Sequence, residues 1–306
     1  REAEAIYARG MAAMTSLLLT ILPTDSHIVM TNDSYRRTRQ FCQTILKRLG
    51  IETTVVPMGD YEAMEAAIIP KKTRIIISES PTNPYLRIAD LEKTVEIAKR
   101  HKVLTAIDST FATPINQRAL EWGIDFVIHS ATKYLSGHND ILVGAVIGRG
   151  SKMQAIRDAR GILGGIVDPH AAYLLDRGLK TLGVRMGQHN ANAVAIARYL
   201  EAHPAIERVF YPGLASHPDH KIAVDQMSGF GGMLALDLGS YDAAKRFLDA
   251  LRLFTLAESL GGVESLAGHP ATMSHGSLAP EERAARGITD GLVRLSCGIE
   301  ETADLV

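Results

Sequence analysis

The chain has 306 residues, of which 46% are hydrophobic and 22% are charged, and its formal net charge is -1 at pH 7. This composition is typical of a globular protein with one large and one smaller domain, and the balanced charge argues against nucleic-acid or membrane-surface binding. Its two cysteines, Cys42 and Cys297, lie far apart in the sequence, which argues against a disulfide framework and favours a reducing cytoplasm.

The chain begins REAEAIYARGMAA, without an initiator methionine, a signal segment or a clear helix cap. We therefore expect it to enter partway through a helix and to lack an upstream segment. A turn at residues 10–13 precedes an apolar helical run that stops at Pro23, which is too short to span a bilayer. The N–H groups where this helix begins could hold a phosphate group.

Short apolar runs in the first half predict strands at residues 27–30, 53–56, 74–77, 103–107 and 126–128. Between the third and fourth runs, Asp90 is a plausible N-cap for a helix that places Leu91, Val95 and Ala98 on one face. This alternation of strands and helices predicts a parallel sheet covered by helices.

The second half has a different pattern. Residues 229–238 predict a strand, after which Ser240 caps a helix with Phe247, Leu248 and Leu251 on one face. We place the domain change near the helical pattern of residues 170–200. This gives a large domain at residues 1–180 and a smaller α+β domain at residues 181–306.

Two later stretches complete this half. GLVRLSCG, at residues 291–298, alternates apolar residues with Arg294 and Ser296, which predicts a strand with one buried and one polar face in an antiparallel sheet. His217 and His220 belong to the sequence HPDH, which we interpret as an exposed, proline-containing turn rather than a metal site, because no third ligand lies nearby.

Polar residues follow four of the strands predicted in the first half. Ligands of open parallel sheets bind beyond the carboxyl ends of the strands, so these residues should meet at one edge. Each one alone is typical of a turn or a cap, but together they predict a site. They are Tyr35 after the first strand, Glu79 and Asn83 after the third, Asp108, Ser109 and Thr110 after the fourth, and Ser130, Thr132 and Lys133 after the fifth.

These residue types match the needs of pyridoxal 5'-phosphate. A lysine amine can form a Schiff base with an aldehyde, and an ionised carboxylate can hold a protonated pyridine nitrogen. An aromatic ring can stack on a flat heterocycle. Hydroxyl groups and the N–H groups of a helix start can hold a phosphate. The sequence therefore predicts a pyridoxal-phosphate enzyme with a small-molecule substrate and no metal.

The chain resembles the Cys/Met metabolism family of pyridoxal-phosphate enzymes, the trans-sulfuration enzymes. The resemblance runs nearly end to end and implies fold type I, the aminotransferase-like fold, with a mainly parallel large domain and a smaller α+β domain. It also implies amino-acid substrates and a homotetramer arranged as a dimer of dimers. The matching motifs are GMAA (10–13), ESPTNP (79–84), IDSTFATP (107–114), HSATKYLSGHND (129–140), RGLKTL (177–182), ESLGGVESL (258–266), HPATMSH (269–275) and VRLSCGIE (293–300).

The resemblance implies a role for each candidate residue around the cofactor ring. Lys133 would attach the cofactor, Asp108 would pair with its ring nitrogen, and Tyr35 would stack on the ring. Asn83 would lie near the ring hydroxyl and the substrate, and Thr110 joins Asp108 among the cofactor-binding residues.

The resemblance also implies the groups at the two ends of the site. Hydroxyl and amide groups would hold the phosphate, namely those of Ser130, Thr132, Gly10 and Met11. The substrate carboxylate would bind to Arg294, bidentate as guanidinium geometry favours, with help from Ser259. Glu258 would meet the distal amino group of the substrate.

Three features depart from the family pattern. An upstream Tyr-x-Arg pair that reaches the neighbouring subunit is not in this sequence, and Arg9 stands where serine is usual before GMAA. Tyr35 is followed by Arg36 and Arg37 rather than by the frequent glycine. The arginine pair adds positive charge near the cavity mouth, where a phosphate or a distal carboxylate could bind.

The motifs YRRTRQF, FATPINQRAL, SGHND and GLASHPDH most resemble plant-type cystathionine gamma-synthases. We therefore expect gamma-replacement, in which an activated homoserine ester loses its gamma substituent and cysteine adds. Gamma-elimination by a cystathionine gamma-lyase is the alternative. Methionine gamma-lyase is disfavoured by SLGG in place of SLGD, beta-lyase by Leu260 in place of tryptophan, and a non-catalytic relative by the intact Lys133, Asp108 and Tyr35.

Overall fold

The computed structural model describes residues 2–274, 276, 278–279, 281, 283 and 286–306, so His275 of the HPATMSH motif lies outside the described residues. The strands are β1 Glu2–Tyr7, β2 His27–Thr31, β3 Glu52–Val56, β4 Thr73–Glu79, β5 Leu104–Asp108, β6 Phe126–Ser130, β7 Gly144–Arg149, β8 Arg208–Phe210, β9 Met233–Asp237, β10 Thr255–Leu256, β11 Leu266–Gly268 and β12 Leu292–Ser296. The helices are α1 Gly10–Ile21, α2 Arg36–Phe41 continued by the π-helix η1 Cys42–Leu46, α3 Tyr61–Ala66, α4 Leu91–His101, α5 Thr113–Asn116, α6 Gly150–Leu163, α7 Pro169–Leu179, α8 Leu182–Glu201, α9 His220–Gln226, α10 Tyr241–Ala250 and α12 Thr302–Leu305.

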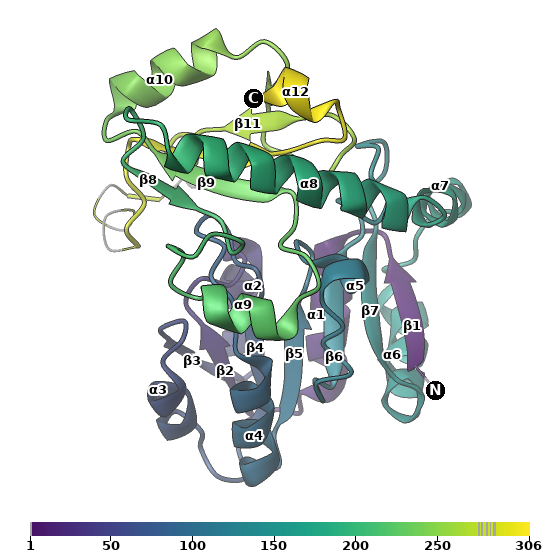
Figure 1. The fold of residues 1–306 in the computed structure, drawn as a ribbon. Coiled ribbons are helices and arrows are strands. Elements are labelled where there is room, and N and C mark those ends of the chain that lie inside the picture. Colours follow the sequence, from purple (N-terminus) through teal and green to yellow (C-terminus); the bar gives the residue numbers. More distant parts are fainter. Residues whose placement is uncertain (1, 275, 277, 280, 282, 284–285) are drawn as a thin grey trace.

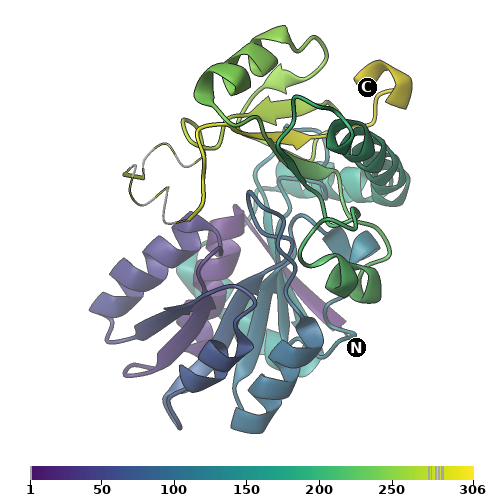
Figure 2. The same ribbon diagram turned by 60° about the vertical axis from the view of Figure 1, so that its left-hand side comes forward.

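The large sheet has the strand order β1-β7-β6-β5-β4-β2-β3 (Figure 1). The five strands from β3 to β6 in this order run parallel, which confirms the predicted parallel sheet, whereas β7 is antiparallel to both of its neighbours, β6 and the edge strand β1. Helices cover both faces, with α1 and α6 on one and α3 and α4 on the other (Figure 2). This is the mainly parallel, helix-covered arrangement expected of fold type I.

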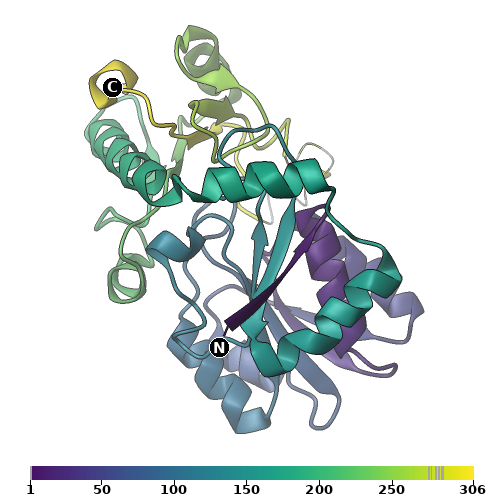
Figure 3. The same ribbon diagram turned by 90° about the vertical axis from the view of Figure 1, so that its right-hand side faces the viewer.

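The predicted start inside a helix is wrong. Residues Glu2–Tyr7 form β1, which pairs with β7 in a register from Glu2 opposite Arg149 to Tyr7 opposite Gly144 (Figure 3). Alternate side chains of β1 are buried, but they are mostly alanines, and alanine and glutamate favour helix by local propensity. Pairing with β7 overrides that propensity.

The predicted helix starts hold in the structure. Asp90 caps α4 by accepting a hydrogen bond from the Lys93 backbone N–H at 3.0 Å, and the predicted inner face of α4 is buried. Ser240 caps α10 by accepting from Ala243 N at 3.3 Å. The predicted inner face of α10 packs against the core of the smaller sheet.

The smaller sheet has the order β10-β11-β12-β9-β8 and is covered by α8 and α10 (Figure 1). As predicted, β12 is antiparallel to both of its neighbours. Its predicted polar face is wrong, because Arg294 and Ser296 are 6% and 1% exposed. That side of β12 faces the large domain and the 258–261 segment, so both polar side chains bond to protein instead of water.

Helix α8 joins the two halves. Leu182 and Met186 pack with residues that follow β6, whereas Ile196 and Leu200 pack under the smaller sheet. The large-sheet strands all lie within residues 2–149 and the smaller-sheet strands within residues 208–296. The boundary near residue 180 falls between α7 and α8 and stays a prediction. Within the described residues, no helix has the length and apolar character needed to cross a membrane.

Candidate active site

The carboxyl ends of the parallel strands bring the predicted residues to one edge of the large sheet. Asp108 is the last residue of β5 and is linked to the end of β6 by Thr110. The Thr110 backbone N–H and hydroxyl both donate to Asp108 Oδ1, at 3.0 and 2.5 Å, and the Thr110 hydroxyl accepts from Ser130 N at 2.8 Å. Burial raises the pKa of Asp108, and the two bonds from Thr110 oppose that rise.

Lys133 lies one turn beyond β6, with its backbone N–H bonded to the Ser130 carbonyl at 3.1 Å. Its Nζ donates to Ser259 Oγ, also at 3.1 Å, so a residue of the second half meets the amine directly. Burial and, to a smaller extent, the nearby Arg294 cation lower the pKa of Lys133 to about 8, against the opposing effect of Glu258. An amine with this pKa is neutral far more often at physiological pH than an ordinary lysine.

Arg294 projects from β12 toward the large domain. Its Nη1 donates to Asn83 Oδ1 at 3.3 Å, and its Nη2 donates to the carbonyls of Glu258 and Ser259 at 2.9 and 3.2 Å. Burial lowers the pKa of Arg294 to about 10. The Glu258 side chain is exposed. Lys133, Ser259, Arg294 and Asn83 therefore form one connected group.

The start of α1 lies against the end of β6. A Cβ atom on Gly10 would be 3.1 Å from Ser130 Cβ, so glycine allows this close approach. The first intrahelical hydrogen bond of α1 runs from Ala13 N to Arg9 O, and the N–H groups ahead of it, including that of Met11, are those a helix leaves for a ligand. The predicted phosphate-holding groups are thus together at this point, although the Thr132 hydroxyl is already bonded to the backbone of Val143.

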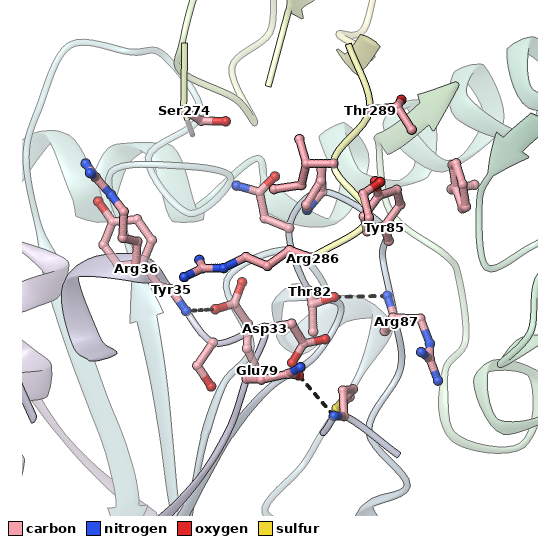
Figure 4. Close-up of a pocket in the computed structure, with 18 of the residues that line it drawn as sticks. Asp33, Tyr35, Arg36, Glu79, Thr82, Tyr85, Arg87, Ser274, Arg286 and Thr289 are labelled. Carbon is pink, nitrogen blue, oxygen red and sulfur yellow. Dashed lines mark hydrogen bonds between the residues drawn. The ribbon is translucent and has the colours of Figure 1, made fainter. Parts of the chain in front are cut away.

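Tyr35 precedes α2 and is 49% exposed. It lines a cavity of about 730 Å³ together with Asn83, Glu79 and Arg36 (Figure 4). The next residue, Arg37, bonds to Gln40 Oε1 at 2.9 Å on the exposed surface. Of the predicted arginine pair, it is therefore Arg36 that reaches the cavity.

The chain matches the family model described as Cys/Met metabolism PLP-dependent enzyme over residues 2–306. It is 47% identical over 305 residues to cystathionine gamma-synthase 1, chloroplastic, of Nicotiana tabacum, covering 99% of this chain and 56% of that protein. It is 45% identical over 306 residues to a cystathionine gamma-lyase of Bacillus subtilis, covering 100% of this chain and 80% of that protein. The chain belongs to the Cys/Met metabolism family of PLP-dependent enzymes.

Solved structures resemble the chain as well. The crystal structure of cystathionine gamma-lyase from Lactobacillus plantarum, complexed with L-serine, aligns with a TM-score of 0.94 at 40% identity, covering 99% of this chain and 79% of that one. The chain spans about half the length of the plant synthases that it matches, at 56% and 54%.

The residues present fit the family cofactor. The set holds an aldehyde-reactive amine in Lys133 and a half-buried acid in Asp108. At the start of α1, a cradle beside Ser130 would be filled by a Cβ on Gly10. These are the groups that pyridoxal phosphate requires for attachment, for its ring nitrogen and for its phosphate.

Some residues of the site were missed in the sequence. Arg185, in α8, is 4% exposed and donates to the carbonyls of Tyr134 and Leu135 at 2.7 and 3.3 Å, which holds the backbone beside Lys133. Asn139 accepts from Ser259 Oγ at 3.2 Å. No pattern in the sequence distinguishes Arg185 from a surface arginine, whereas Asn139 lies inside the SGHND motif.

The predicted exposed turn at HPDH is wrong for two of its residues. His217 and Asp219 are 4% and 6% exposed, because both bond to the segment that follows β4. His220 bonds through Nδ1 to the carbonyl of Pro212 at 2.8 Å.

Proposed function

We propose that this chain catalyses gamma-replacement on an activated homoserine ester with cysteine, as a pyridoxal-phosphate enzyme of trans-sulfuration. The observation that carries the proposal is the contact between Lys133 and Ser259, beside the buried guanidinium of Arg294. An amine that captures an aldehyde, next to a group that binds a carboxylate, suits an amino-acid substrate.

Each residue has a distinct task in this proposal. Bound pyridoxal phosphate supplies an electron sink for chemistry at the substrate α carbon. Asp108 would hold its ring nitrogen, Tyr35 its ring face, and the start of α1 with Ser130 its phosphate. Lys133, whose pKa of about 8 leaves a large neutral fraction near that pH, would then accept the α proton from the substrate at Nζ.

Arg294 would hold the substrate carboxylate through its guanidinium, which Asn83 and the carbonyls of residues 258 and 259 keep in one orientation. Ser259 fixes the Lys133 amine at 3.1 Å and would aim it at the α carbon. Glu258 is exposed at the rim of this group, where it could meet an incoming or distal amino group. The substrate would thus be held by its carboxylate, while its gamma substituent is replaced at the other end.

Gamma-replacement is favoured by the likeness to plant cystathionine gamma-synthases at 47% and 45% identity. Gamma-elimination is the second candidate, because a gamma-lyase is 45% identical. Steady-state assays separate the two. We expect cystathionine formation from a homoserine ester plus cysteine to exceed cystathionine cleavage in kcat/KM, and faster cleavage than synthesis would favour the lyase.

The ester is proposed to carry an anionic gamma substituent, phosphoryl or succinyl. Arg36 lines the cavity that opens beside Tyr35 and Asn83, where a guanidinium favours a phosphate or carboxylate. A neutral acetyl group would gain less from this contact.

We also propose a homotetramer arranged as a dimer of dimers. Large apolar side chains are exposed along α6, α7, the link between them and the start of α8, which is the usual mark of a protein interface. They are Ile162, Leu163, Ile166, Tyr173, Leu179 and Val184, with exposures from 41% to 84%. The proposed compartment is the cytoplasm, where buried free thiols such as Cys42 and Cys297 stay reduced.

A further inference from the structure

The HPDH turn, residues 217–220, lies just before and at the start of α9 and bonds to the large domain. Asp219 Oδ2 accepts from Arg87 Nε at 2.5 Å and from the Ile88 backbone N–H at 2.9 Å. Its Oδ1 accepts from Arg87 Nη2 at 3.1 Å. One buried carboxylate thus receives three hydrogen bonds, two of them in the bidentate geometry that fixes direction as well as distance.

His217 adds a fourth bond. Its Nδ1 accepts from the Asp219 backbone N–H at 3.2 Å, so the proton of the neutral ring is on Nε2, which donates to the Tyr85 carbonyl at 3.2 Å. Burial lowers the pKa of His217, which keeps the ring neutral at neutral pH. The HPDH turn is therefore hydrogen-bonded to the main chain at Tyr85 and Ile88 and to the side chain of Arg87.

The gripped segment is the loop of residues 82–88, here called the Asn83 loop. It is closed on itself by Thr82, whose N–H donates to the Arg87 carbonyl at 3.0 Å and whose hydroxyl accepts from Arg87 N at 3.1 Å. Its other end carries Asn83, which accepts from Arg294 at 3.3 Å. Figure 4 shows the hydrogen bond between Thr82 and Arg87, and the guanidinium of Arg87 points away from Tyr35.

We infer that the HPDH turn is a positioning element for substrate binding, in which Asp219, through Arg87, fixes the Asn83 loop and thereby the orientation of Arg294. The inference rests on the proposed function, in which Arg294 holds the substrate carboxylate. The groups proposed to bind the cofactor's aldehyde, ring nitrogen and phosphate lie elsewhere, on β5, β6 and α1, whereas Asn83 would lie only near the ring hydroxyl. Loosening the turn should therefore weaken amino-acid binding far more than cofactor binding.

The first test is Asp219→Asn, which keeps the side-chain shape and removes the charge. We expect KM for the amino-acid substrate, and the dissociation constant for glycine read from the cofactor absorbance, to rise by about ten- to a hundredfold. The value of kcat should stay unchanged, because the lost interaction binds the substrate equally in the ground state and the transition state. The affinity of the apoprotein for pyridoxal phosphate should change little, because its main anchors lie outside the Asn83 loop. The matched control is Asp225→Asn, an exposed acid of α9, which should change none of these.

Hydrogen exchange of the apoprotein gives a readout independent of activity. Asp219→Asn should speed exchange in peptides that cover residues 82–91, because the Ile88 N–H loses a charged acceptor. Arg87→Lys, which keeps the charge and loses the planar fork, should give a smaller rise in both KM and exchange. Arg87→Lys also provides this test if the Asp219→Asn variant fails to fold.

A double-mutant cycle tests the route. In an Arg294→Lys background, Asp219→Asn should raise the glycine dissociation constant much less than in the wild type. An undiminished effect there would overturn the inference, as would an unchanged KM and glycine affinity in a folded variant, or a parallel loss of cofactor affinity. Glycine binding is read whether or not homoserine esters react, so failure of the proposed reaction is distinguishable from failure of this inference.

Discussion

Glu79, the last residue of β4, accepts a hydrogen bond from the backbone N–H of Tyr35, the residue before α2, at 2.7 Å. In the parallel register, Glu79 stands opposite Asp108. Burial raises the pKa of Glu79 well above its ordinary value, and the negative charges of Asp108 and Asp33 raise it further. The tyrosine proposed to cover the cofactor thus depends on an acid that resists ionisation.

Replacing Glu79 with glutamine should therefore change the pH dependence of stability. The raised folded pKa means that the native state holds more protons than the unfolded state, so the wild type loses stability as pH rises above about 4.5 toward the folded pKa. Glu79→Gln lacks this loss. Its free energy of unfolding in the apoprotein should gain on the wild type between pH 5 and pH 8 in urea titrations. Glu96→Gln, an exposed site on α4, is the control, and parallel curves for wild type and Glu79→Gln would contradict the prediction.

Lys133 should capture pyridoxal phosphate with a rate that follows its neutral fraction. With a pKa of about 8, about a tenth of the amine is neutral at pH 7, against about one part in three thousand for an ordinary lysine. Capture followed by absorbance should fall about tenfold per pH unit below pH 8 and level off above it. Lys133→Ala should abolish it and leave turnover near background, whereas Lys180→Ala, an exposed lysine, should not. A borohydride-reduced peptide labelled at another lysine would refute the assignment.

Asp108→Asn should separate stability from function. Burial raises the pKa of Asp108, so its ionisation costs stability in the apoprotein above about pH 4, and the asparagine variant should be at least as stable at pH 7. With cofactor, the same change should lower α-proton exchange of a bound amino acid by orders of magnitude, since the ring nitrogen loses its partner. Intact exchange together with altered cofactor affinity would show that the assigned role is wrong.

The neighbouring arginines offer a matched pair of variants. Arg36→Ala should raise KM for a phosphoryl or succinyl ester by about ten- to a hundredfold, the loss of a charge-assisted hydrogen bond worth about 1.5–3 kcal/mol, and leave the acetyl ester little changed. Arg37→Ala removes the same charge next to it but outside the cavity lining, so it should alter neither ester strongly. Equal effects on the two esters would reject the pocket role of Arg36.

The exposed apolar side chains of α6 and α8 predict the assembly. Sedimentation of the wild type should show at least a dimer, and Ile162→Glu combined with Val184→Glu should shift it to smaller species, because each buries a charge in the proposed interface. Leu49→Glu, exposed elsewhere, is the control. An active wild-type monomer at assay concentration would contradict the proposal.

The sequence predicted those parts of the fold that follow from local patterns. The parallel strands are short runs rich in apolar and β-branched residues, and Asp90 and Ser240 are caps that satisfy helix N–H groups within three residues. The start of the chain and the polar face of β12 were predicted wrongly, because contacts with residues far away in the sequence decide their structure and exposure. β1 becomes a strand only by pairing with β7, and the polar side of β12 is covered by the other domain.

The same distinction applies to the site. Residues at strand ends, such as Asp108 and Lys133, could be placed at one edge from topology alone. The contact of Lys133 with Ser259 crosses from one half of the chain to the other, and sequence position gives no distance for it. Arg185 was missed for the same reason, since its partners are backbone carbonyls that no motif marks.

The absence of a side chain at Gly144 has a consequence for the order of events during folding. A Cβ there would lie 2.1 Å from the Arg9 carbonyl oxygen, so the first residue of β7 and the residue before α1 touch backbone to backbone. The cradle at the start of α1 is thus complete only after β7 has joined the sheet, late in the synthesis of the large domain. Pyridoxal phosphate would therefore find its phosphate cradle complete only once β7 is in place.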